Sequence, residues 1–213
     1  MTLQSQLVAA PYSNQAGAEY LTAVAMDALA LYRNGAEIYG QGEDAGPLYA
    51  VEFGCVRIGR ITSDGKRQVC GFCFGGDVFG WESGEEHQFF AEAVGSCGIR
   101  VLRPHRDEQA STKLLPMVIQ SLARLQEHVI LLGYITVDER LAAFLHYLAE
   151  RQGHDRYISL PMQRTDIADY LGVSSETVSR ILRRFKDRGL IRLPDIHSVE
   201  IVNRGALARI FAH

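Results

Sequence analysis

The sequence lacks any hydrophobic run of the length that a membrane-spanning helix needs. It also lacks an N-terminal leader in which a basic stretch precedes an apolar core. These two absences predict a protein that stays in the cytoplasm and contacts no membrane. The chain has only four cysteines, and in a reducing compartment we expect free thiols rather than disulfides.

The residue patterns of common enzyme and metal sites are missing as well. The seven histidines form no His-x-His or His-x-x-x-His pair, so the sequence predicts no metal ligands. There is no Gly-x-Ser-x-Gly elbow and no phosphate-binding loop. We therefore expect no catalytic residues and no enzyme activity.

Charge is divided unevenly along the 213 residues. Residues 1–137 hold 10 basic and 15 acidic side chains, a net charge of −5, whereas residues 138–213 hold 12 and 10, a net charge of +2. The C-terminal part is therefore the candidate for a polyanionic partner.

The stretch 164–193 predicts two short helices joined by a tight turn. Thr165 can cap the first helix, and Gly172 can end it in the left-handed conformation. Ser174 offers an N-cap for the second helix, and Gly189 ends it. The inner face of the second helix is apolar at the helical period, at Val178, Ile181, Leu182 and Phe185.

The outer face of the second helix carries residues suited to DNA. Residues 175–192 hold six basic and two acidic side chains, a net charge of +4, which favours phosphate contact. The predicted base-reading residues are Ser175, Glu176, Ser179 and Arg180. The predicted contacts to the DNA backbone are Thr165, Ser174, Thr177, Arg183, Arg184 and Lys186.

The run from Glu176 to Arg180, Glu-Thr-Val-Ser-Arg, resembles the Glu-x-x-Ser-Arg pattern of the FNR and FixK branches of the CRP/FNR family of bacterial transcription regulators. In those branches the trio reads a TTGAT half-site. The resemblance therefore implies that Glu176, Ser179 and Arg180 read bases. The CRP branch has a different residue where this chain has Ser179, which argues against the half-site of that branch.

Residues 35–102 have a pattern typical of β-strands, with short apolar runs at 48–53, 56–61 and 68–74 between glycines. Asp64-Gly65 predicts a hairpin turn between two of the strands. Residues 20–31 can form a short helix. The β pattern suggests a sandwich or barrel, and the resemblance implies a jelly roll of the cyclic-nucleotide-binding type.

Residues 113–136 predict one long helix, capped by Ser111 or Thr112, with Pro116 in its first turn. Six apolar residues along it repeat at spacings of three and four, as in a coiled coil, and predict a homodimer interface. They are Leu115, Val118, Leu122, Leu125, Val129 and Leu132. Packing on the β domain of the same chain is the alternative for this helix.

The C-terminal region completes a winged helix-turn-helix. Residues 138–152 predict a helix and 157–160 a short strand. The strands of the wing are predicted at 190–193 and 198–202, joined across Pro194-Asp195, and a last helix at 205–212. The fold class is thus α+β, with a jelly-roll regulatory domain at 1–110, a dimerisation helix at 111–137 and a DNA-binding domain at 138–213.

The sensor residues of the family are largely missing. Its nucleotide binders carry a glutamate where Trp81 stands here, and an Arg-Ser or Arg-Thr pair where His87-Gln88 stands, so we expect no cyclic nucleotide. The oxygen-sensing members use N-terminal cysteines, and residues 1–54 contain none. Cys70 and Cys73 have Cys-x-x-Cys spacing, but residues three apart point to opposite faces of the strand predicted at 68–74. We therefore expect no cofactor.

Two sensing chemistries stay open. Cys55 or Cys97 can act as a thiol switch if its thiolate is stabilised. Haem can bind through one histidine, because a single axial ligand leaves little trace in a sequence.

The missing sensor residues are typical of FixK-like members, which the resemblance implies are active without a small ligand. The recognition helix and the apolar seam predict a homodimer that binds double-stranded DNA, and the resemblance implies an activator that also contacts RNA polymerase. By resemblance, it controls genes for low-oxygen respiration, denitrification or nitrogen fixation. The alternative is the same scaffold acting as a sensor of haem, nitric oxide or thiol redox state.

Overall fold

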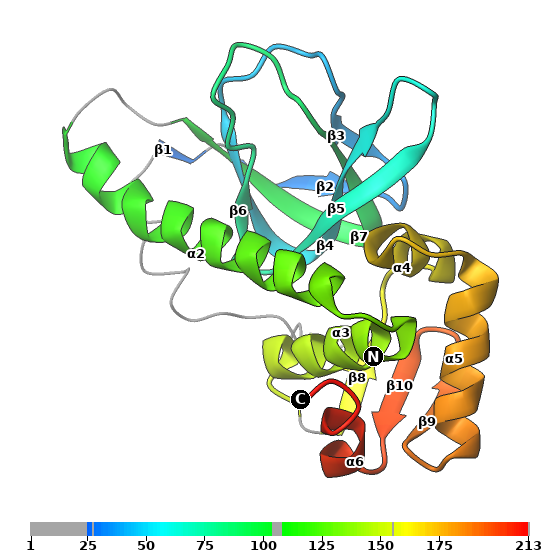
Figure 1. The fold of residues 1–213 in the computed structure, drawn as a ribbon. Coiled ribbons are helices and arrows are strands. Elements are labelled where there is room, and N and C mark those ends of the chain that lie inside the picture. Colours follow the sequence, from blue (N-terminus) through cyan, green and yellow to red (C-terminus); the bar gives the residue numbers. More distant parts are fainter. Residues whose placement is uncertain (1–24, 27, 104–107, 155, 213) are drawn as a thin grey trace, which may run out of the picture.

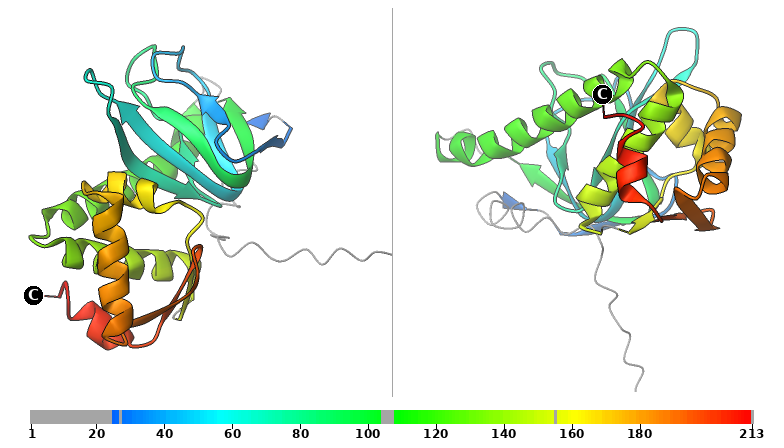
Figure 2. Two further views of the ribbon diagram at one scale, coloured as in Figure 1. Left: turned by 90° about the vertical axis from the view of Figure 1, so that its right-hand side faces the viewer. Right: turned by 60° about the horizontal axis from the view of Figure 1, so that its bottom comes forward.

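A computed structural model describes residues 25–26, 28–103, 108–154 and 156–212 of the chain (Figure 1). In this part, a rolled antiparallel sheet forms one domain, helix α2 runs along it, and a second domain of helices and a small sheet follows (Figures 1 and 2). This arrangement confirms the predicted α+β class. No helix within these ranges is long and apolar enough to cross a bilayer.

The β domain is organised around two long strands. These are β4 (Leu48–Ile61) and β7 (Phe90–Arg103), which pair along most of their length. The other strands pair with these two and are β1 (Ala25–Met26), β2 (Ala30–Tyr32), β3 (Glu37–Tyr39), β5 (Arg67–Phe74) and β6 (Val78–Phe79). Gly65 turns the hairpin between β4 and β5 with a φ of 77°, which confirms the predicted turn.

Two expectations for this domain were wrong. The apolar runs at 48–53 and 56–61 are one continuous strand, β4, because Gly54 does not break it. Gly54 lies at a register shift with a φ of 89°, and a Cβ there would be 2.5 Å from the carbonyl oxygen of Ser96. The expected helix at 20–31 is also wrong for its described part, where β1 and β2 pair with β7. Its residues 20–24 lie outside the described residues.

Helix α2 (Glu108–Gly133) starts earlier than expected. Pro116 therefore lies inside the helix rather than in its first turn, and residues 111 and 112 are not its caps. One face, which includes Met117 and Leu131, is buried against the rest of the chain. The six seam residues are only partly covered, with 36% to 63% of their surface exposed.

The second domain begins with α3 (Val137–Gln152), which is capped by Thr136 and ends at Gly153. Its predicted inner residues Leu141, Phe144, Leu145 and Leu148 are fully buried. The remaining elements are β8 (Tyr157–Ser159), α4 (Arg164–Leu171), α5 (Ser175–Asp187), β9 (Ile191–Asp195), β10 (Ser198–Ile201) and α6 (Arg204–Ala208). Pro194 and Asp195 belong to strand β9 and not to the turn, and α6 ends earlier than expected.

The two domains share part of one core. Phe72 of β5 packs against Tyr170 of α4, with ring centroids 5.3 Å apart, and against Phe144 of α3 at 6.3 Å. Burial of each such ring contributes about 1.5–3 kcal/mol. The first helix of the helix-turn-helix is therefore packed directly on the β domain.

Candidate nucleic-acid interface

The helix-turn-helix begins with a cap that differs from the expected one. The backbone N–H of Gln163 donates to the Asp166 carboxylate, with N and Oδ2 3.1 Å apart. Thr165 is therefore not the cap but an exposed residue in the first turn of α4. Asp166 determines where the helix starts, because its carboxylate at the third helical position accepts a hydrogen bond from the residue before the helix. Gly172 ends α4 with a φ of 68°, as predicted.

Helix α5 starts where the sequence predicts. The backbone N–H of Thr177 donates to Ser174 Oγ at 3.2 Å, which confirms Ser174 as the N-cap. Its predicted inner residues Val178, Ile181, Leu182 and Phe185 are at most 2% exposed. Because that face is fixed in the core, the opposite face of α5 is presented outward (Figure 2, left).

Five residues line one shallow hollow on the outer face of α5. They are Ser175, Glu176, Ser179, Arg180 and Arg183. The structure thus brings together the four residues that the sequence suggests for base reading, with Arg183 beside them. The hollow presents hydroxyl groups, a carboxylate and two guanidinium groups, which are the donors and acceptors that match base edges in a major groove.

The charge of Glu176 is stabilised by its place at the helix start. Hydrogen bonds from its own backbone N–H and from the Ser174 hydroxyl lower the pKa of the Glu176 carboxyl. The side chain is therefore an anion at neutral pH. It can accept a hydrogen bond but cannot donate one.

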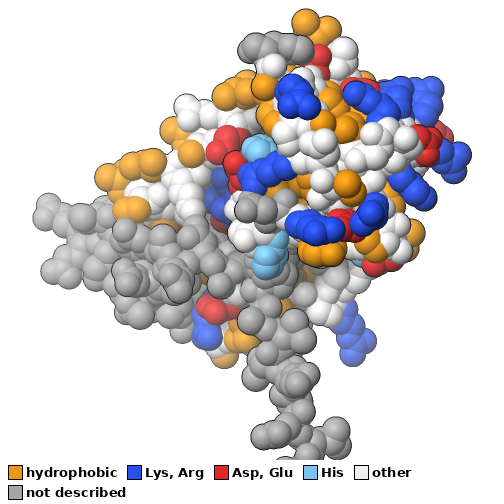
Figure 3. Space-filling view, turned by 90° about the horizontal axis from the view of Figure 1, so that it is seen from below, with side chains coloured by type: hydrophobic (Ala, Val, Ile, Leu, Met, Phe, Trp, Pro, Cys, Tyr) orange, Lys and Arg blue, Asp and Glu red, His pale blue; other side chains and the backbone are white. Residues whose placement is uncertain are grey.

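Lys and Arg side chains gather around α5, along the right-hand side of the face in Figure 3. Among the described residues, Arg180, Arg183 and Lys186 form no ion pair. Arg184 differs, because it pairs with Asp138 of α3. Thr165 also lies apart from the hollow and lines a cleft that includes Arg57 and Arg67.

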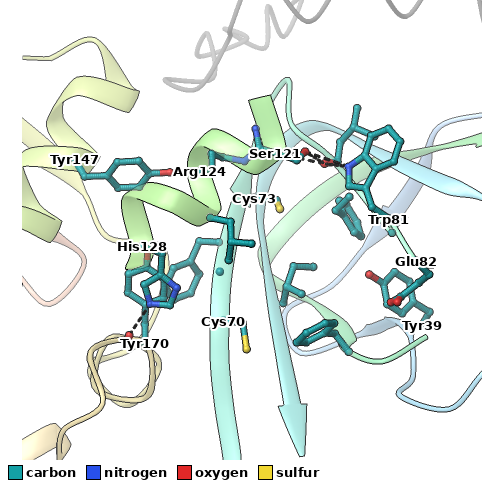
Figure 4. A pocket seen from close by; sticks show the side chains of 18 residues that line it. Tyr39, Cys70, Cys73, Trp81, Glu82, Ser121, Arg124, His128, Tyr147 and Tyr170 are labelled. Carbon is teal, nitrogen blue, oxygen red and sulfur yellow. Dashed lines mark hydrogen bonds between the residues drawn. The ribbon is translucent and has the colours of Figure 1, made fainter. Parts of the chain in front are cut away.

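A second candidate site is a cavity of about 240 Å³ between the β domain and α2 (Figure 4). The indole N–H of Trp81 donates to Ser121 Oγ at 3.1 Å and to the Val78 carbonyl at 3.3 Å. Arg124 is the one Lys or Arg among the described lining residues, and its Nη1 donates to Asp77 Oδ1 at 3.0 Å.

Comparison with known proteins places the chain in a family. The profile of a cyclic nucleotide-binding domain matches residues 30–106, and that of a Crp-like helix-turn-helix domain matches residues 139–210. The nitrogen fixation regulation protein FixK of Rhizobium meliloti is 44% identical over 179 residues, covering 84% of this chain and 85% of that protein. The chain belongs to the CRP/FNR family of transcription regulators.

Further members resemble this chain closely. The fumarate and nitrate reduction regulatory protein of Escherichia coli K12 is 31% identical over 195 residues, covering 85% of this chain and 77% of that protein. The solved structure of FixK2 from Bradyrhizobium japonicum superposes with a TM-score of 0.79 at 37% identity, covering 87% of this chain and 98% of that one. The CRP/FNR chain described here is thus a DNA-binding regulator and not an enzyme, as the sequence predicts.

The cavity of this CRP/FNR member does not fit a cyclic nucleotide. Arg124 is engaged by Asp77, so no described lining cation is free for a cyclic phosphate. His87, which stands in place of an arginine, is 1% exposed and stacks on Tyr39 with ring centroids 3.7 Å apart. Its Nδ1 lies 3.4 Å from the Glu82 carboxylate, which is therefore also occupied.

The cysteines of the chain are poor candidates for metal or redox chemistry. Cys55, Cys73 and Cys97 are buried, and Cys70 is half-buried. Burial raises the pKa of all four thiols, to about 12 for Cys73 and about 11 for Cys97. The described residues hold no group of three or more His, Cys, Asp or Glu side chains that could bind a metal ion.

The sequence did not reveal the ion pairs that join the domains. The carboxylate of Asp77 is completely buried and accepts from Arg124 of α2 and from Arg151 of α3, with Oδ2 2.6 Å from Arg151 Nη2. These partners are separated from Asp77 by 47 and 74 positions. No short-range pattern reports a contact of that kind.

Proposed function

We propose that this protein is a homodimeric transcription activator that binds a palindrome of TTGAT-like half-sites. The observation that carries the proposal is the hollow on α5, where Glu176, Ser179 and Arg180 lie together on an exposed helix start. That is the position at which a recognition helix meets base edges. The likeness to two proteins named nitrogen fixation regulation protein FixK supports the same reading.

Each residue of the hollow has a distinct role in this proposal. Arg180 donates two hydrogen bonds to O6 and N7 of a guanine, and Glu176 accepts one from N4 of a cytosine. Ser175 and Ser179 contact neighbouring base edges through their hydroxyl groups. The phosphate contacts come from Thr165, Ser174, Thr177, Arg183, Arg184 and Lys186, where Arg184 must first leave Asp138.

The partly exposed seam of α2 supports a homodimer. Six apolar residues at coiled-coil spacing lie on its surface, and such a stripe is stable when it is covered by a second helix. A dimer also supplies one recognition helix to each half of a palindrome. In this proposal 1–110 is the regulatory unit, 111–137 the dimerisation helix and 138–213 the DNA-binding unit.

We infer that no small-molecule effector is needed, because the cavity offers no free cation among its described residues. The protein then acts in the cytoplasm with RNA polymerase, on genes for low-oxygen respiration, denitrification or nitrogen fixation. The alternative, a sensor of haem, nitric oxide or thiol redox state, has less support. His128 is engaged by the Tyr170 carbonyl, 3.1 Å from its Nε2, and the pKa of every thiol is raised.

Fluorescence anisotropy with ligand-free protein tests the proposal. The probe is a duplex with two inverted TTGAT half-sites whose centres are about one helical turn apart, and a scrambled duplex is the control. We expect selective binding at near-physiological salt. Arg180→Ala should weaken the specific complex by about 1–3 kcal/mol and relax the choice at one base pair.

Arg188, an exposed residue at the end of α5, is the matched control. Arg188→Ala removes a cation from the same helix without altering the hollow, so the weaker attraction to phosphates should affect specific and scrambled complexes alike. If unaltered protein binds both duplexes equally, the proposed specificity is wrong. If Arg180→Ala behaves like Arg188→Ala, then Arg180 contacts phosphate and does not read a base.

A further inference from the structure

Two arginines of the β domain reach across to the first helix of the helix-turn-helix. Arg57 of β4 and Arg67 of β5 both contact Asp166 Oδ1, from Nη1 at 3.0 Å and from Nη2 at 2.8 Å. Arg67 also donates from Nε and Nη2 to Asp169 Oδ2, at 3.1 and 2.8 Å. We call Arg57, Arg67, Asp166 and Asp169 the interdomain clamp.

The clamp is held in place from both sides and is not an ordinary surface ion pair. The side chain of Asp166 is 2% exposed and that of Arg57 is 17% exposed. A second carboxylate, Glu92 of β7, lies 2.6 Å from Arg57 Nη2 and fixes that arginine on the sheet. Asp166 is likewise fixed, because its Oδ2 accepts from the backbone N–H of Gln163 at the start of α4.

The clamp lies at the edge of the apolar contact between the domains. Phe72 and Tyr170, whose rings pack across the domains at a tilt of 51°, belong to the same pair of elements, β5 and α4. Burial disfavours the charge on Arg67, but the hydrogen bonds and charges of Asp169 and Asp166 outweigh that effect, so the pKa of Arg67 is raised. The guanidinium is therefore held as a paired cation.

The orientation of α4 decides where α5 points. The two helices are joined through only three residues, Gly172 to Ser174, and Ile167 of α4 and Val178 of α5 belong to one buried cluster. A tilt of α4 relative to the β domain therefore carries α5 with it. In a dimer joined through α2, such a tilt changes the distance between the two recognition helices.

We propose that Arg57 and Arg67 are positioning residues for DNA recognition, which hold α4 through Asp166 and Asp169 and so set the spacing of the two recognition helices without a ligand. The proposal rests on the proposed reading role of α5 and on the dimer. A bound effector can select one of two domain arrangements. In this proposal the clamp selects the arrangement instead, and no effector is needed.

The test compares a full palindrome with a duplex that holds one half-site. One recognition helix binds the half-site, so domain spacing does not affect that complex. Arg67→Gln removes the charge but keeps most of the side-chain length. We expect affinity for the palindrome to fall about 5- to 150-fold, the usual range of coupling between sites. Affinity for the half-site should stay within twofold of the unaltered protein, on the order of experimental scatter.

Two variants complete the design. Arg67→Lys keeps a point charge near Asp169 and should recover part of the affinity for the palindrome. Lys66→Gln is the matched control, because Lys66 pairs with Asp64 on the exposed hairpin and is not part of the clamp. Small-angle scattering of Arg67→Gln should show a broader distribution of distances between the domains.

Three results would contradict the proposed role of the clamp. Equal losses on palindrome and half-site would mean a folding defect or a direct DNA contact. No difference between Arg67→Gln and Lys66→Gln would mean that the ion pairs do not set the orientation. A gain in affinity would mean that the clamp holds an inactive arrangement. Failure of the proposed function looks different, because the unaltered protein would then not prefer the palindrome over scrambled DNA.

Discussion

Loss of the Asp77 carboxylate should destabilise this fold strongly. This buried carboxylate accepts three hydrogen bonds, from the Phe74 backbone N–H at 2.9 Å, Arg124 Nη1 at 3.0 Å and Arg151 Nη2 at 2.6 Å. The side chains of Arg124 and Arg151 are 14% and 17% exposed. Asp77→Asn keeps the shape but leaves two nearly buried guanidinium groups without a counter-charge.

The magnitude follows from these contacts. A hydrogen bond to a charged group contributes about 1.5–3 kcal/mol, so two of them bound the loss at about 3–6 kcal/mol. Breaking a buried ion pair by removing one partner typically costs about 3–5 kcal/mol. We therefore expect Asp77→Asn to lower the free energy of unfolding by about 3–5 kcal/mol, because small shifts let each arginine regain some water.

Urea denaturation measures this loss. Trp81 is the only tryptophan of the chain and is hydrogen-bonded to Ser121 of α2. Its fluorescence therefore reports on the contact between the β domain and α2, where Asp77 pairs with Arg124. The midpoint should fall by about 1–2 M urea, at one fixed protein concentration because a dimer stabilises itself by mass action. Asp64→Asn, which breaks the exposed pair with Lys66, should leave the midpoint unchanged. A loss below about 1 kcal/mol for Asp77→Asn would refute the expected stabilisation. The cost of removing the three charged groups from water would then cancel the free energy gained from their ion pairs.

The remaining predictions concern the dimer, pH and the thiols. Leu122→Glu should weaken dimerisation by on the order of 100-fold, because it places two carboxylates in an apolar seam; sedimentation velocity measures it. Burial lowers the pKa of His128 from 6.5, against the opposing effect of hydrogen bonds with the backbone of Tyr170 and Cys70. The unfolded chain therefore takes up this proton first, and unfolding free energy should fall as pH drops below 6.5, with a shallower slope in His128→Gln. Iodoacetamide at pH 7.5 should react slowly and first at Cys70, because the other three thiols are buried.

Each of these predictions has a result that contradicts it. A dimer of unchanged affinity in Leu122→Glu would place Leu122 outside the interface, and Gln126→Glu, an exposed neighbour, is the control. An equal pH slope in His128→Gln would assign the titration to another group. Rapid alkylation of Cys55 or Cys97 in the native protein would restore the thiol-switch alternative.

Local structure in the DNA-binding domain could be predicted from the sequence with few errors. The end of α4 at Gly172, the cap at Ser174 and the buried face of α5 depend on residues within one or two helical turns. The incorrect prediction of Thr165 as the cap also concerns neighbouring residues. Asp166, three positions after Gln163, accepts the backbone N–H at the helix start in place of the Thr165 hydroxyl. The turn of the β4–β5 hairpin was likewise predicted from the dipeptide Asp64-Gly65 alone.

The sequence by itself thus determined the elements of the helix-turn-helix, the apolar seam of α2 and the set of side chains presented by α5. Only the tertiary structure decided that β4 continues through Gly54, that Asp77 joins three elements, and that the clamp ties α4 to the sheet. The physical reason is separation along the chain. Helix caps and faces follow from neighbouring residues, whereas Arg67 and Asp166 are 99 positions apart and meet only because packing of Phe72 against Tyr170 brings their elements together.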